Sequence, residues 1–127
     1  MSIARLSLLA ASLCATAVQA LADGQDGYVF CDNGLRCIAA PCPSNSALEL
    51  ATGEIIRGVV IDIDGLPQED KALDLQEKLY AGTIVIAGSI ETRTQTFYGK
   101  RQIVRTLVAT GIERAARPSE RRHCSSR

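Results

Sequence analysis

The sequence is poor in aromatic side chains: it has no Trp, three Tyr and two Phe among 127 residues. Proteins that bind single-stranded nucleic acid stack the bases on aromatic side chains, so nucleic-acid binding is not expected. After residue 22 no stretch approaches the ~20 apolar residues that cross a bilayer, and no membrane span is predicted. With 46% hydrophobic and 22% charged residues, the chain has the composition of a single folded domain.

Residues and motifs that commonly carry catalysis are also scarce. His123 is the only His, and it lies in the C-terminal tail without a base or nucleophile on a regular element beside it. No Gly-x-Ser-x-Gly motif occurs in the sequence. The segment Asp62-Ile63-Asp64-Gly65 resembles the start of a calcium loop, but its glycine comes fourth where an EF-hand has it sixth. The sequence therefore predicts a non-catalytic protein without a metal or a cofactor.

Residues 1–22 have the pattern of a secretory signal. A basic residue at position 5 is followed by an apolar run up to Val18 and by small residues at Ala20 and Ala22. Cleavage after Ala22 makes Asp23 the first residue of the mature chain, and cleavage after Ala20 is the alternative. The protein is therefore expected to be periplasmic or secreted in a bacterium.

The mature chain keeps an even number of cysteines. Cys14 is removed with the signal, and an exported chain with four others is expected to pair them as disulfides: Cys31, Cys37, Cys42 and Cys124. The sequence allows three pairings, of which we favour one local bridge within the N-terminal cluster and one long bridge to Cys124. The spacing Cys-x5-Cys-x4-Cys departs from that of zinc knuckles, which argues against a metal site.

Composition divides the mature chain into three parts. We assign residues 23–46 to a Cys-rich segment, residues 47–114 to a β-rich core domain and residues 115–127 to a basic tail. The tail has no apolar periodicity after Ile112, so it is expected to be disordered up to whatever Cys124 holds.

Charge is distributed unevenly along the mature chain. Residues 23–92 contain 4 basic and 12 acidic side chains, whereas residues 93–127 contain 9 basic and 2 acidic ones. Acidic and basic strands that lie side by side screen each other across a sheet, which is the favoured explanation. A basic docking face is the alternative.

Alternating apolar residues predict five strands and helical spacing predicts one helix. The strands cover residues 28–30 as an edge strand, 48–51, 54–64, 83–91 and 102–113, with a bulge or bend at Gly88. Residues 68–81 form the helix, with Pro67 near its start and Gly82 after its end. Leu73 and Leu79 are expected to pack against the sheet.

This order of elements, β-β-β-α-β-β, is that of a five-stranded OB barrel with its helix between the third and fourth strands. The fold class is therefore mainly β with one helix, and an OB-like barrel is the favoured architecture. An open antiparallel sheet packed by one helix is the alternative.

The segment from Cys37 to Pro43, Cys-Ile-Ala-Ala-Pro-Cys-Pro, is the most unusual part of the chain. If Cys37 pairs with Cys42, the loop between them is rigidly displayed, and rigid display lowers the cost of ordering it on binding. The alternative is a purely structural role, in which the cysteines stabilise an N-terminal segment that has few core residues. The candidate binding residues are Ile38, Ala39, Ala40 and Pro41.

This Cys/Pro-rich motif, followed by an acidic-ended strand and by Ile86-Ala87-Gly88, resembles an uncharacterised family of small exported bacterial proteins. The family's motif is Cys-x-x-Pro-x-Cys followed by glycine, whereas this chain has Cys-x-x-x-Pro-Cys. The resemblance covers Tyr28 to Arg114 and implies no activity and no functional residue.

Two functional hypotheses follow from these observations. The first is an exported non-catalytic domain that binds an unknown protein or envelope partner. The second is an inhibitor of a secreted protease or other hydrolase, which acts through the loop between Cys37 and Cys42.

Overall fold

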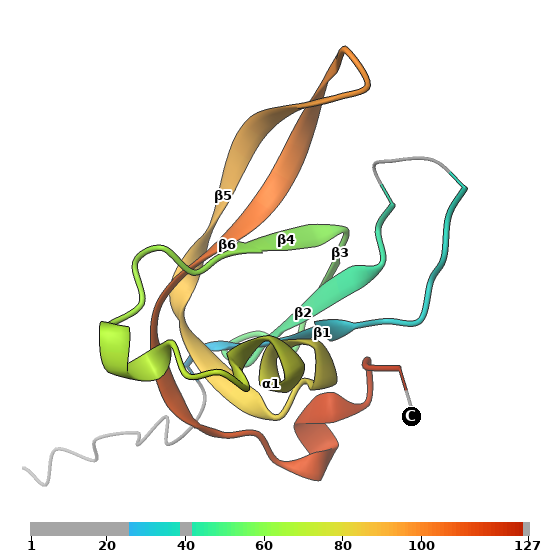
Figure 1. Ribbon diagram of the computed structural model, residues 1–127. Coiled ribbons are helices and arrows are strands. Elements are labelled where there is room, and N and C mark those ends of the chain that lie inside the picture. Colours follow the sequence, from blue (N-terminus) through green and yellow to red (C-terminus); the bar gives the residue numbers. More distant parts are fainter. Residues whose placement is uncertain (1–25, 39–41, 126–127) are drawn as a thin grey trace, which may run out of the picture.

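The computed structural model describes residues 26–38 and 42–125, drawn in colour in Figure 1. The predicted signal, residues 1–22, lies outside the described residues, as do Ala39, Ala40 and Pro41. One six-stranded sheet has the order β3-β2-β1-β5-β6-β4, and every neighbouring pair is antiparallel except β4 with β6. The strands are β1 (Tyr28–Asp32), β2 (Asn45–Glu49), β3 (Ile55–Arg57), β4 (Val59–Asp62), β5 (Ile84–Phe97) and β6 (Lys100–Ala115).

The fold is mainly β with one α-helix, as predicted, but the sheet is open and not a closed five-stranded OB barrel. Its two edges, β3 and β4, are separated in sequence only by Gly58. Gly58 has a φ of +72°, which favours glycine, and it breaks the predicted continuous strand 54–64 into two strands with different neighbours. The sheet therefore curls until its edges meet at Gly58, and within the described residues no ladder pairs β3 with β4. The alternative of an open antiparallel sheet is wrong for β4, which is parallel to β6.

The first strand is central in the sheet, so its prediction as an edge strand is wrong. β1 pairs with β2 along its whole length and meets β5 at Tyr28 and Ile86. Its middle residues, Val29, Phe30 and Cys31, are all buried. A short apolar run is compatible with burial on both faces, and periodicity alone does not show where in a sheet it lies. The predicted Cys-rich segment thus shares its sheet with the predicted core domain.

The predicted helix over residues 68–81 is much shorter in the structure. A 3-10 turn, η1 (Gln68–Asp70), is followed by α1 (Leu75–Ala81). Most helical stability in proteins comes from the packing of an apolar face, and only Leu75 and Leu79 supply buried side chains here. Leu73, which we expected to pack on the sheet, is instead fully exposed.

Helix α1 lies against β1 at the base of the molecule shown in Figure 1. Phe30 of β1 and Tyr80 of α1 meet edge to face with ring centroids 6.0 Å apart. Gly82 ends the helix in the left-handed conformation, as predicted, and a Cβ there would lie 2.7 Å from Sγ of Cys124. The core brings together side chains from α1 and several strands: Phe30, Val59, Leu79, Ile86 and Leu107.

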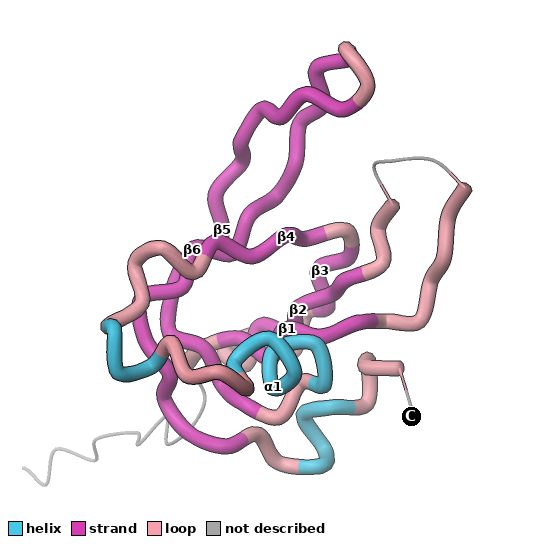
Figure 2. The backbone as a smooth tube through the Cα atoms, viewed as in Figure 1, coloured by secondary structure: helices cyan, strands magenta, loops and turns pink. Residues whose placement is uncertain are grey.

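Strands β5 and β6 form a long hairpin whose distal part stands away from the rest of the molecule (Figure 2). We expected residues 92–96 to lie outside the strand, but β5 continues through them. Three of these five residues are threonines, and β-branched residues favour strands. The expected irregularity at Gly88 is present as a shift in register after Ala87. A side chain at Gly88 would collide with the Val108 carbonyl oxygen, which explains the glycine there.

The basic tail is ordered as far as Ser125, so its predicted disorder is wrong. After β6 it forms a 3-10 turn, η2 (Pro118–Arg121). The buried Glu120 carboxylate accepts hydrogen bonds from the Arg114 guanidinium and from the Arg117 backbone N–H. An ion pair between Arg114 of β6 and Glu120 of the tail therefore helps to hold the tail in place, in addition to the disulfide at its end.

Candidate functional site

The four cysteines in the described part of the chain form one long and one short disulfide. Cys31 pairs with Cys124 across 93 residues, and Cys37 pairs with Cys42 across five. Cys31 is completely buried, so the long bridge belongs to the core. Cys37 is exposed, so the short bridge closes a loop at the surface.

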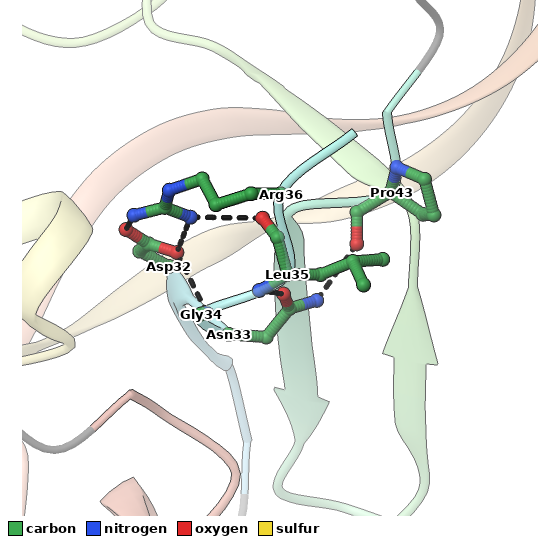
Figure 3. A network of polar contacts seen from close by, with 6 residues as sticks. All are labelled: Asp32, Asn33, Gly34, Leu35, Arg36 and Pro43. Atoms are coloured by element: carbon green, nitrogen blue, oxygen red, sulfur yellow. Dashed lines mark hydrogen bonds and ion pairs between the residues drawn. The ribbon is translucent and has the colours of Figure 1, made fainter. Parts of the chain in front are cut away.

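A polar network holds the N-terminal side of this loop (Figure 3). Arg36 donates hydrogen bonds from Nη1 and Nη2 to the two carboxylate oxygens of Asp32, at 3.0 and 2.8 Å. These bonds raise the pKa of Arg36. The Gly34 N–H donates to Asp32 Oδ1 at 2.8 Å, and Gly34 has a φ of +85°. The sequence Asp32-Asn33-Gly34 is typical of such a turn, because Asn and Gly adopt positive φ readily. The chain that enters the loop is therefore fixed directly after β1.

Asn33 connects the two ends of the loop. Its backbone N–H donates to the Ser44 carbonyl at 2.8 Å, and its Nδ2 donates to the Pro43 carbonyl at 2.8 Å and to Ser46 Oγ at 2.9 Å. Its Oδ1 accepts the Leu35 N–H at 2.9 Å. The sequence indicates a turn at Asn33 but not these bonds across the loop, because the partners lie up to 13 residues away.

Above this base, Ile38 is fully exposed, with a relative accessibility of 109%. A single exposed aliphatic side chain is common on protein surfaces. Ile38, however, directly follows a disulfide-bonded cysteine in a loop whose two ends are also joined by Asn33. Of the four predicted binding residues, Ile38 is the one that the structure describes, and the other three lie outside the described residues.

A groove of about 340 Å³ lies between this loop and the β5–β6 hairpin. The two projections stand on the same side of the molecule in Figure 1, with β4 between them. The sequence analysis did not identify this groove, because its walls come from distant segments that the curled sheet brings together. Most of its lining is apolar and includes Pro43, Val59, Val60, Phe97, Ile103 and Val104.

His123 has a structural environment. Its Nε2 lies 2.8 Å from the Val29 carbonyl oxygen, and burial lowers the pKa of the ring, so we assign a neutral His that donates from Nε2. Its Nδ1 is buried without a partner among the described residues. His123 also lies close to the sulfurs of Cys31 and Cys124, but both are bonded in the disulfide and offer no thiolate to a metal.

Asp62, the first carboxylate of the segment that resembles a calcium loop, is engaged within the protein. Asp62 accepts a hydrogen bond from Arg93 Nη1 at 2.7 Å and one from the Asp64 N–H at 2.9 Å, and the bond from Arg93 lowers the pKa of Asp62. Arg93 also pairs with Glu91 at 3.2 Å. This cluster is one contact between an acidic residue of the first part of the chain and a basic residue of the second.

Comparisons of the chain with protein-family models, curated proteins and solved structures give no match. In the part of the chain that the structure describes, no helix has the length and apolar character needed to cross a membrane. The function is therefore inferred from the loop, the groove and the hairpin themselves.

Proposed function

We propose that the protein is an exported, non-catalytic domain that binds a partner protein through the loop closed by Cys37 and Cys42. The observation that carries this proposal is the fully exposed Ile38 on a loop tied both by a disulfide and by Asn33. A loop held in one conformation before binding loses less conformational entropy when the complex forms. Such a loop is suited to recognition.

The two disulfides support export, because disulfides persist in oxidising compartments. The environments of His123 and Asp62 support a non-catalytic role. His123 is partly buried and hydrogen-bonded to the Val29 carbonyl, and Asp62 is paired with Arg93. Neither is therefore presented as a free acid or base to a substrate.

Inhibition of a secreted protease or other hydrolase is the second candidate function. The disulfide and the hydrogen bonds of Asn33 favour inhibition as well, since a rigid segment that enters a substrate groove needs little further ordering. In this case Ile38 occupies a specificity pocket of the enzyme.

The test compares two equally exposed aliphatic residues, Ile38 at 109% and Leu73 at 107% relative accessibility. Peptides from a displayed library are selected on the wild-type protein, and their affinities are measured on Ile38→Asp and Leu73→Asp by calorimetry. We expect Ile38→Asp to weaken binding roughly tenfold or more, by removing an apolar contact and adding a charge. Leu73→Asp should leave the affinity unchanged. Equal affinities for the two variants would refute binding through the loop.

A panel of secreted proteases separates the two candidate functions. An inhibitor is expected to slow at least one protease, and Ile38→Asp should abolish that inhibition. Selected peptides that bind in an Ile38-dependent manner, without inhibition of any protease, would favour the partner-binding function.

A further inference from the structure

We propose that the groove between the loop and the hairpin binds an extended, acidic segment of the partner as an additional strand along β6. The inference rests on the proposed function, because it specifies the chemistry and binding mode of that partner. Three features carry it: an unpaired strand edge, an apolar wall and a basic charge.

The unpaired edge results from the different lengths of β6 and β4. β4 pairs with β6 only from Arg105 to Val108, so residues 100–104 of β6 have no neighbouring strand on that side within the described chain. An earlier start of β4 would cover this stretch of β6, but the chain changes direction at Gly58, between β3 and β4. Free N–H and C=O groups along such an edge form a template for another strand.

The apolar wall runs beside this free edge. Pro43 faces the hairpin across the groove, Val59 and Val60 lie where β4 begins, and Ile103 and Val104 belong to the uncovered part of β6. Ile103 is 77% exposed, so an incoming strand could bury it. Side chains alternate between the two faces of a strand, so every second residue of an extended peptide can contact the groove.

Charge favours an acidic occupant. From position 100 to position 105, β6 carries Lys100, Arg101 and Arg105 and no acidic residue. Glu91 of the neighbouring strand is already paired with Arg93. A second copy of this edge would bring basic residues against basic residues, which destabilises strand pairing, whereas an acidic strand pairs favourably.

A third strand is expected to stabilise the distal part of the β5–β6 hairpin. Beyond the main sheet it consists of two strands, with exposed side chains at Thr92, Thr94, Thr96 and Arg101. A two-stranded ribbon is marginally stable alone, and a third strand with an apolar face stabilises it. Binding is therefore expected to order the distal hairpin.

The test uses three fluorescein-labelled peptides of equal length. Glu and Val alternate in the first, Lys and Val alternate in the second, and the third is the Glu/Val peptide N-methylated along one edge. We expect the Glu/Val peptide to bind roughly tenfold more tightly than the Lys/Val peptide by fluorescence anisotropy, and less tightly at high salt. N-methylation of the edge that faces β6 should abolish binding, because it removes the backbone donors.

Amide hydrogen exchange gives a direct readout of strand addition. With the Glu/Val peptide bound, the outward amides among residues 101–104 should exchange roughly tenfold more slowly. Arg101→Glu should lower the affinity for this peptide roughly tenfold. Arg122→Glu, which reverses the same charge at an exposed position outside the groove, should not. Absence of binding, or binding without slower exchange, would overturn the inference.

The same measurement separates this inference from the proposed function. If library-selected peptides depend on Ile38 but leave the exchange of residues 101–104 unchanged, strand addition is wrong and binding through the loop stands. If they slow this exchange but bind Ile38→Asp as tightly as the wild type, strand addition stands and binding through the loop is wrong.

Discussion

Replacement of Glu120 by Gln tests how the C-terminal segment is held. The Glu120 carboxylate accepts hydrogen bonds from Arg114 Nη1 and Nη2, at 2.8 and 2.9 Å, and from the Arg117 N–H at 2.7 Å. The bonds from Arg114 are the main cause of a Glu120 pKa lowered from 4.5 to about 2. The Glu120 side chain is only 11% exposed, so water screens this pair less than a surface pair.

The lowered pKa sets the size of the effect. A carboxyl with a pKa of about 2 in the folded state and 4.5 in the unfolded state contributes roughly 3 kcal/mol to the free energy of unfolding at neutral pH. Because a quarter of the Arg114 side chain is exposed, we expect ~2 kcal/mol after screening. The folded pKa lies below the unfolded one, so this contribution is complete above pH 4.5 and is lost as the pH falls towards about 2.

Urea unfolding of the wild type and of Glu120→Gln as a function of pH measures this contribution. The variant should be less stable by ~2 kcal/mol at neutral pH, and the two proteins should converge as the pH falls from 4.5 towards about 2. Asp74→Asn is the control, since the pair of Asp74 with Lys78 is half exposed and is expected to contribute less than ~1 kcal/mol. A difference that does not change with pH would refute the ionic explanation. No difference at neutral pH would show that the disulfide alone holds the tail.

Two further predictions concern the core and the disulfides. Leu79→Ala should lower the free energy of unfolding by ~2–5 kcal/mol because it leaves a cavity, whereas Leu73→Ala should change it by less than ~0.5 kcal/mol in the same urea titration. Equal effects would mean that Leu79 is not the core residue of α1. Replacement of both Cys31 and Cys124 by Ser should cost ~4–5 kcal/mol, because the long bridge closes a loop with a separation of 93, whereas loss of the short bridge should cost ~2 kcal/mol. Thermal unfolding checks this order, and a larger loss from the short bridge would contradict it.

Several local features were predictable because neighbouring residues decide them. Gly82 ends α1 as expected, since a left-handed residue favours glycine. The turn at Gly34 and the irregularity at Gly88 follow from the same conformational preferences and from the close approach of the backbone. Leu79 is buried as expected, but Leu73 is not, because it precedes the first residue of α1.

The sequence by itself determined a β-rich fold with one α-helix and a loop bounded by cysteines, because periodicity, turn residues and cysteine content are properties of short segments. Only the tertiary structure decided that the two edge strands meet at Gly58, that β1 is central and that Glu120 anchors the tail. The groove also depends on the tertiary structure, since its lining residues come from segments as far apart in the sequence as Cys42 and Val104. Contacts of this kind depend on how the whole sheet curls, and no local pattern encodes that curvature.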